Sequence, residues 1–325
     1  MSSGCSSTKS SEKDQIRTGD PNFFSCLPSE QDLVSGDHRE DGMRLITTVK
    51  EMKTLAQELK SGGKVIGLVP TMGYLHEGHL SLVRTSLEKT DVTVVSIFVN
   101  PTQFGPREDF SHYPRDLDRD IQILEKMGVE IVFHPEPEEM YPEGYKTYVE
   151  IPVLQTKLCG RSRPGHFRGV CTIVLKLFHI IHPELAFFGQ KDAQQSIILK
   201  RMVEDLDMEV RIEVLPIVRD ADGLALSSRN TYLNEGGRKA ALCLWKSLSL
   251  AQSMVQRGER DPQIILQKMR GIIQKEPLAK IDYAEIVDPE ELNPLSRIEG
   301  EALIAMAVYI GKVRLIDNVL VKGKE

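Results

Sequence analysis

Two histidines separated by a Glu-Gly pair, His76 and His79, follow a short apolar run and open a helical pattern. A helix that begins here presents free backbone N–H groups and the positive end of its dipole, which attract phosphate. Gly78 lacks a side chain, so the backbone can come close to a ligand. The pattern indicates a nucleotide phosphate site. Two surface histidines in a turn, or a metal site, are the alternatives, because short motifs recur by chance.

Two more polar segments come directly after predicted strands. Asn100 and Gln103 carry neutral amides that suit a hydroxyl or a carboxylate, although an ordinary polar turn has the same composition. Lys191 supplies a cation, and Asp192 either caps the next helix or lies near Mg²⁺. Gln195 follows one turn later. A capping Asp after a solvated Lys is the simpler interpretation of this segment.

A fourth segment places two hydroxyls beside a guanidinium, Ser227, Ser228 and Arg229. The planar fork of Arg can bridge two oxygens, so the segment is suited to clamping phosphate, and a surface loop is the alternative. A basic run covers residues 161–168. It either closes over an anionic substrate or is exposed to water, and the sequence does not separate the two.

These segments need elements that bring them together. Apolar runs predict strands at 64–69, 92–99, 129–133, 185–188 and 210–215, and helical spacing covers 46–59, 80–87, 116–127, 169–181 and 194–206. Apolar strands that alternate with helices predict an α/β fold with a Rossmann-like, doubly wound parallel sheet, whose ligands lie beyond the carboxyl ends of the strands.

The alternation of predicted strands and helices ends near residue 217. Two helices at 237–256 and 263–274 precede strands at 281–287, 302–309 and 313–321, and the Gly311-Lys312 connection predicts a final antiparallel hairpin. We therefore expect a Rossmann-like domain over 43–217 and a smaller α+β domain over 218–325. Residues 1–42 are polar and poor in large apolar side chains, which predicts a disordered N-terminal tail.

Composition excludes several classes of protein. A net charge of −6 argues against a large basic surface for nucleic acid. The 5 cysteines form neither a CxxC pair nor a metal-ligand spacing, so a disulfide framework and a zinc site are not indicated and a reducing, cytoplasmic setting fits. No apolar run reaches the roughly 20 residues that span a bilayer, and the N-terminus lacks the features of a secretory signal or a transit peptide.

The segments together resemble the pantothenate synthetase family, also called pantoate–β-alanine ligase. The segments that carry the resemblance stand in the family's order: PTMGYLHEGH, FVNPTQF, RPGHFRGV, FGQKDAQQ and LSSRN. The resemblance covers about residues 44–325. The first segment alone is similar to the HxGH signature of the wider nucleotidyltransferase superfamily, and the other four narrow it to one family.

The resemblance implies roles for particular residues. His79, His76 and Lys191 correspond to catalytic positions, and Asn100, Gln103 and Gln195 to positions that hold pantoate and β-alanine. The positions implied to line the ATP site are Pro70, Thr71, Met72, Gly73, Tyr74, Leu75, His76, Glu77, Gly78, His79, Gly189, Gln190, Lys191, Asp192, Val218, Leu226, Ser227, Ser228 and Arg229. Leu226 stands where many members carry Met, a near-isosteric change.

The resemblance also implies the reaction and its partners. The pantoate carboxylate attacks the α-phosphorus of ATP to give a pantoyl adenylate and pyrophosphate, and β-alanine then displaces AMP. Mg²⁺ and a homodimer are implied as well. The nearest alternatives are another HxGH adenylyltransferase and a non-catalytic nucleotide-binding or tRNA-interacting protein.

Overall fold

The computed structural model describes Met1, residues 42–106 and residues 108–323. Residues Gly42–Glu325 form one compact unit. The tail expected over residues 1–42 lies outside the described residues apart from its two ends, and the expected division of the remainder near residue 217 stays a prediction.

A six-stranded parallel sheet forms the first half of the unit, in the order β1-β4-β3-β2-β5-β6. Its strands are β1 Arg44–Ile46, β2 Ile66–Thr71, β3 Val92–Ile97, β4 Ile131–Phe133, β5 Leu185–Gly189 and β6 Arg211–Leu215. The chain runs from β2 outward through β3 to β4, then returns to the other side of β2 for β5 and β6. The order therefore reverses between β2 and β5, where parallel sheets of this kind open a crevice for ligands.

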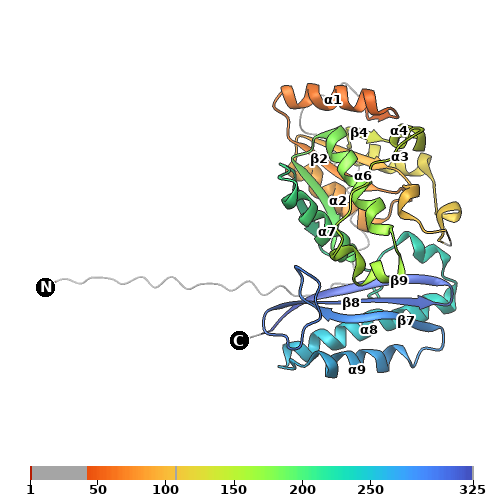
Figure 1. Cartoon of the computed structure of the whole chain (residues 1–325), viewed down its shortest axis with the longest axis vertical. Coiled ribbons are helices and arrows are strands. Elements are labelled where there is room, and N and C mark those ends of the chain that lie inside the picture. The colour runs from red at the N-terminus through yellow and green to blue at the C-terminus, as the bar shows by residue number, and fades with distance from the viewer. Residues whose placement is uncertain (2–41, 107, 324–325) are drawn as a thin grey trace. The chain divides into compact units, whose positions relative to one another are not determined.

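Helices cover both faces of this sheet, namely α1 Val49–Ser61, α2 Glu77–Lys89, α3 Leu117–Lys126, α6 His166–Ile181 and α7 Ala193–Asp205 (Figure 1). Successive strand residues point to opposite faces. Leu68 packs with α1, α6 and α7, whereas its neighbour Val69 packs with α2 and α3. Residues buried on two faces explain the uninterrupted apolar runs of the sequence, and the predicted doubly wound sheet is confirmed.

The second half contains helices α8 Glu235–Gln256 and α9 Pro262–Ile273 and strands β7 Ala279–Val287, β8 Glu301–Ile310 and β9 Val313–Lys322. The strands form an antiparallel sheet in sequence order, and α8 and α9 pack on one of its faces (Figure 1). Ile310 pairs with Val313 across the predicted Gly311-Lys312 turn. The smaller α+β arrangement expected from the sequence is confirmed.

Several boundaries differ from the sequence prediction by a few residues, and two of these differences have a clear physical reason. Ile46 is the last residue of strand β1, and Thr48 caps α1 by accepting a hydrogen bond from Glu51 N, so the predicted helix begins too early. Pro70 lies inside β2, one residue beyond the predicted end of the strand. A proline is tolerated at this position because β2 pairs with β5 only at Gly67 and Leu68, so the missing N–H interrupts no hydrogen bond to β5.

The helices of the described part are too short or too polar to cross a membrane. The described cysteines, Cys159, Cys171 and Cys243, are buried and free. Burial raises the pKa of the Cys171 thiol to about 12, so this thiol stays protonated and behaves as a small apolar group.

The contact of α2 with β2 provides a test of this packing. A Cβ atom on Gly67 would lie 2.3 Å from the Ser86 Oγ and 2.7 Å from the Thr90 Oγ1. We expect Gly67→Ala to lower the free energy of unfolding by about 1–3 kcal/mol, the usual cost of overpacking. Urea unfolding measures this difference. Gly271→Ala is the matched control, since nothing lies within 4 Å of a Cβ added in α9, and equal stability of the two variants would contradict the packing argument.

Candidate active site

A buried carboxylate shapes the turn that joins β2 to α2. Asp120, from α3, is 0% exposed and accepts hydrogen bonds from Tyr74 N at 2.6 Å and Leu75 N at 2.8 Å. The turn needs this support because Gly73 and Tyr74 have φ angles of 79° and 52°, in the left-handed region. A Cβ atom on Gly73 would also lie 3.0 Å from an Ile97 methyl group, so glycine is required there.

The two histidines stand at the start of α2 and contact each other. His76 is the N-cap residue, and its Nδ1 accepts a hydrogen bond from Gly78 N at 3.2 Å. The Nδ1 of His79 accepts from His76 N at 3.3 Å. The rings stack with centroids 4.0 Å apart. Each histidine therefore fixes the backbone that carries the other.

Both rings are neutral. Burial and the charge of Lys191 lower the pKa of His76 to about 4, and burial with the neighbouring His76 lowers the pKa of His79 well below 6.5. Because both Nδ1 atoms accept hydrogen bonds, the ring proton is on Nε2 in each case. Neither Nε2 has a hydrogen-bond partner within residues 42–106 and 108–323. Two N–H donors are thus available to a ligand.

Other residues of the first motif point elsewhere. Leu75 is 1% exposed and belongs to the core between the sheet, α2 and α3. Glu77 is exposed and forms an ion pair with Arg84 along α2. A Cβ atom on Gly78 would lie 2.9 Å from the His76 ring, so this glycine accommodates the ring as well as any ligand.

The Lys191 loop is held from the C-terminal sheet. Lys191 and Asp192 lie in the 3-10 helix η5 Gln190–Asp192 between β5 and α7. Asn318 of β9 donates hydrogen bonds to Gln190 O at 2.9 Å and to Lys191 O at 3.0 Å. Asp192 occupies the N-cap position of α7 but forms no capping hydrogen bond. Its carboxylate instead lies 3.5 Å from the Nζ of Lys191, so the two side chains form an ion pair at the edge of the loop.

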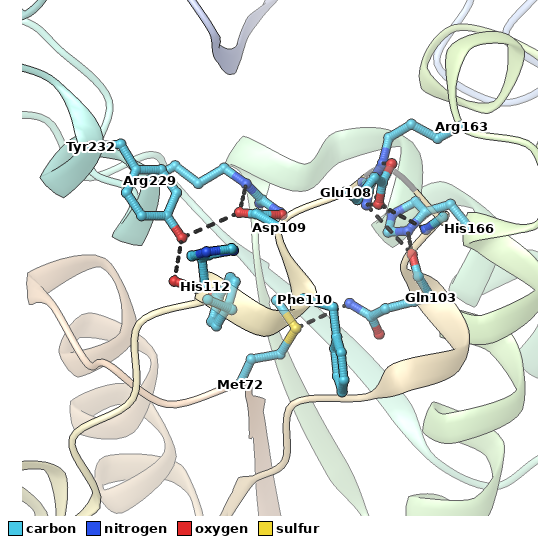
Figure 2. A network of polar contacts seen from close by, with 12 residues as sticks. Met72, Gln103, Glu108, Asp109, Phe110, His112, Arg163, His166, Arg229 and Tyr232 are labelled. Atoms are coloured by element: carbon cyan, nitrogen blue, oxygen red, sulfur yellow. Dashed lines mark hydrogen bonds and ion pairs between the residues drawn. The ribbon is translucent and has the colours of Figure 1, made fainter.

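The Ser-Ser-Arg segment contacts the first motif and a neighbouring acid. Ser228 donates a hydrogen bond to Tyr74 O at 3.4 Å. Arg229 binds Asp109 through Nε at 3.0 Å and Nη2 at 2.9 Å, and Tyr232 approaches the same carboxylate (Figure 2). The predicted phosphate clamp therefore already has an internal anion, while the Nη1 of Arg229 has no hydrogen-bond partner in the described part of the chain.

The neutral amides lie at the carboxyl end of β3, around the 3-10 helix η2 Pro101–Gln103. Asn100 is 1% exposed and donates from Nδ2 to the Gln103 Oε1 at 3.0 Å. The amide of Gln103 donates in turn to the Met72 sulfur at 3.2 Å (Figure 2). Asn100 is thus a buried support, and Gln103 is the partly exposed amide that remains able to meet a ligand.

A cavity of about 800 Å³ opens beside these loops and extends along the sheet of β7, β8 and β9. The predicted residues that line it are Lys191, Asp192, Gln195, Ser227 and Arg229. His76, His79 and Gln103 do not line it. The charge of Lys191 still contributes to lowering the pKa of both histidines, so they lie within its electrostatic range.

Several residues at this edge carry no signal in the local sequence. Asp120 reaches its partners from 45 residues away, and Asn318 from 127 residues away. Glu108 and Asp109 resemble ordinary loop acids in the sequence, but in the structure they form ion pairs with Arg163 and Arg229, respectively. Long-range pairing of this kind is invisible to a motif, which records only neighbours along the chain.

A metal ion would find few protein ligands here. The part of the chain that the structure describes contains no group of three or more His, Cys, Asp or Glu side chains suited to a metal ion. Asp192 is a single carboxylate, 46% exposed in its side chain, on the wall of the cavity. One carboxylate is enough for Mg²⁺ that is held mainly by the phosphates of a nucleotide.

The parallel sheet, whose order reverses between β2 and β5, and the helix that starts with a histidine pair define a Rossmann-like α/β protein. The family model for pantoate-beta-alanine ligase matches residues 44–320. This chain belongs to the pantoate-beta-alanine ligase family. A pantothenate synthetase from Fervidobacterium nodosum is 58% identical over 279 residues, which cover 86% of this chain and 99% of that protein.

Solved structures show the same fold. Pantothenate synthetase from Thermus thermophilus superposes with a TM-score of 0.82 at 43% identity, covering 85% of this chain and 99% of that one. Pantoate-beta-alanine ligase from Francisella tularensis, complexed with "Beta-gamma ATP" and beta-alanine, gives a TM-score of 0.72 at 35% identity, with 86% and 98% covered. The 85–86% of this chain that superposes therefore corresponds to nearly the full length of these relatives.

The buried carboxylate under the histidine turn yields a prediction. Asp120→Ala leaves the N–H groups of Tyr74 and Leu75 without acceptors, at about 1–3 kcal/mol each, so we expect the free energy of unfolding to fall by roughly 2–6 kcal/mol. Urea unfolding measures the loss. Asp118→Ala, at an exposed position of the same helix, should change stability by less than about 0.5 kcal/mol. Similar losses in both variants would count against the support assigned to Asp120.

The protonation of His76 is a second prediction. We expect ¹⁵N NMR of labelled histidine to show the Nε2–H tautomer, with a titration midpoint near the value of about 4 expected from burial. The unfolded chain then binds more protons than the folded one between about pH 6.5 and pH 4, so stability should fall as the pH decreases through that window. The urea-unfolded protein is the control. A His76 midpoint near 6.5 in the folded protein would refute the neutral pair.

Proposed function

We propose that this protein uses ATP to condense pantoate with β-alanine, releasing AMP and pyrophosphate. The observation that carries the proposal is the cavity at the carboxyl ends of the strands, where Lys191, Ser227 and Arg229 provide donors for phosphate and Gln195 provides a neutral amide. Membership of the pantoate-beta-alanine ligase family supports the same reaction.

The first step forms a pantoyl adenylate. A carboxylate oxygen of pantoate attacks the α-phosphorus of ATP, and the bond to the bridging oxygen breaks so that pyrophosphate leaves. Negative charge builds on the phosphoryl oxygens, and positioned donors stabilise it. His76 and His79 would donate from Nε2 as neutral dipoles, Lys191 would supply positive charge, and Arg229 would donate from Nη1 while its other nitrogens keep Asp109.

The second step forms the amide. The amine of β-alanine attacks the acyl carbon of the adenylate, loses a proton, and displaces AMP. Gln103 and Gln195 would hold pantoate by hydrogen bonds without adding charge, with Gln103 also close to β-alanine. The family resemblance assigns the remaining residues of the first motif to the ATP site, and Gly189, Gln190, Val218, Leu226 and Ser228 would line the same site.

Mg²⁺ fits as a companion of ATP. Asp192 would hold it together with the phosphates, and the ion would supply neutralising charge to the triphosphate. A cytoplasmic setting is supported by the free thiols of Cys159, Cys171 and Cys243, which are typical of a reducing compartment. A homodimer belongs to the proposal on the strength of the family resemblance.

One coupled assay tests the function. We expect the purified protein to release AMP only when ATP, pantoate and β-alanine are all present, and to exchange pyrophosphate with ATP when pantoate alone is added. Accumulation of an adenylylated product in place of AMP, or ATP binding without pyrophosphate release, would disprove the proposal.

Two substitutions test the assigned residues. His79→Ala and Lys191→Ala should each lower kcat by about 10²–10³, the usual loss when one positioned donor to a developing charge is removed. Lys268→Ala, at an exposed site on α9, is the control and should keep wild-type turnover. Circular dichroism confirms folding, and near-wild-type rates in folded His79→Ala and Lys191→Ala would overturn the site.

A further inference from the structure

The basic run at residues 161–168 divides into an inner and an outer set. The side chain of Arg163 is 16% exposed, against 52% for Arg161 and 48% for Arg168. Arg163 and His166 point toward Gln103 (Figure 2), whereas Arg168 pairs with Glu150 at 3.8 Å on the surface. The sequence left open whether the run closes over an anionic substrate or is exposed to water. Arg163 and His166, the inner pair, instead contact other residues of the protein.

The inner pair forms one continuous chain of contacts. Arg163 binds both oxygens of Glu108, from Nε and Nη2, at 2.7 Å each. Its Nη1 lies 2.9 Å from the Nε2 of His166. The Nδ1 of the same ring lies 2.8 Å from the backbone oxygen of Gln103. The chain therefore runs from a loop carboxylate to the main chain of the predicted pantoate-binding residue.

The chemistry of these groups allows one arrangement of protons. A guanidinium only donates, so the Nε2 of His166 accepts, and a carbonyl only accepts, so the Nδ1 carries the proton. Burial and the charge of Arg163 lower the pKa of His166 to about 3. Burial alone would raise the pKa of Glu108, but its contacts with Arg163 outweigh that effect and lower it to about 2. The chain of contacts thus keeps the same protonation across the neutral range.

Helix α6 contacts the backbone around Gln103 at a second position, Gly169. A Cβ atom on Gly169 would lie 2.4 Å from Thr102 O and 2.6 Å from Gln103 N. Asn100 donates from Nδ2 to Gly169 O at 3.1 Å. The first turns of α6 therefore fix η2 by close contact at Gly169 and by a directed hydrogen bond at His166.

We propose that Arg163 and His166, held by Glu108, are positioning residues for the reaction: they fix the main chain of Gln103 and so aim its amide at the pantoate subsite. This inference rests on the proposed function. It assigns the pair an action through Gln103 and not a contact with the reacting atoms. Glu108, Arg163 and His166 all line the cavity, so the hydrogen-bond chain forms part of its wall.

Steady-state kinetics of His166 variants test the proposal. His166→Ala removes the closer of two donors to Gln103 O, at 2.8 Å, and leaves the Nη2 of Arg163 at 3.5 Å. We expect the KM for pantoate to rise about tenfold, the usual effect of one lost hydrogen bond, while the KM for ATP stays within about twofold. His166→Asn places an amide donor near the former Nδ1 and should restore most of the loss. Arg168→Ala is the matched control from the outer set and should behave as wild type.

The outcomes separate this inference from the proposed function. If the wild-type protein releases no AMP, the function itself is wrong. If the wild type is active and folded His166→Ala keeps its KM for pantoate, the positioning role is wrong. Equal rises in KM for ATP and pantoate, or a fall confined to kcat, would also overturn it. Should His166→Ala not fold, Arg163→Lys provides the same test, because a lysine cannot bridge Glu108 and His166 together.

Discussion

The pair of hydrogen bonds from Tyr74 N and Leu75 N to the buried carboxylate of Asp120 is the constraint on which the rest of the site depends. The chain must leave β2 through two left-handed residues, which L side chains rarely adopt. Only that path starts α2 with His76 as its cap. A polar contact inside the protein thus decides where two imidazoles stand at the sheet edge.

Carboxylates compensate most of the arginine charge that lines the cavity. Arg163, Arg229 and Arg314 line it, and each faces a carboxylate, respectively Glu108, Asp109 and Asp282. His76 and His79 are neutral, because burial disfavours the charged imidazolium and lowers the pKa of both rings. An acidic chain can therefore build an anion site without a strongly basic surface. Oriented donors and a few cations near the ligand are sufficient, and most of the guanidinium charge serves to hold loops in place.

The elements of the fold were predictable because burial on two faces leaves long apolar runs, such as Val92–Ile97, between clear helical patterns. Strand β1 was missed since three residues are too few to show a period, and Ile46 fitted the spacing of the helix after it. The segments with His76, Lys191 and Arg229 could be proposed as site residues because the side chains that suggest their chemistry are neighbours in the sequence. Asp120 and Asn318 were not, since each acts on a partner far along the chain.

The hydrogen bonds from Asn318 to the Lys191 loop affect how the protein is made. The two residues are 127 positions apart, and at roughly 5–20 residues per second of synthesis this distance corresponds to about 6–25 s. During that interval the parallel sheet can assemble on the ribosome while its lysine loop still lacks an anchor. The cavity that Lys191 lines is therefore completed late in translation, and a nascent chain stalled before β9 would carry a formed sheet without the cavity wall that β9 supplies.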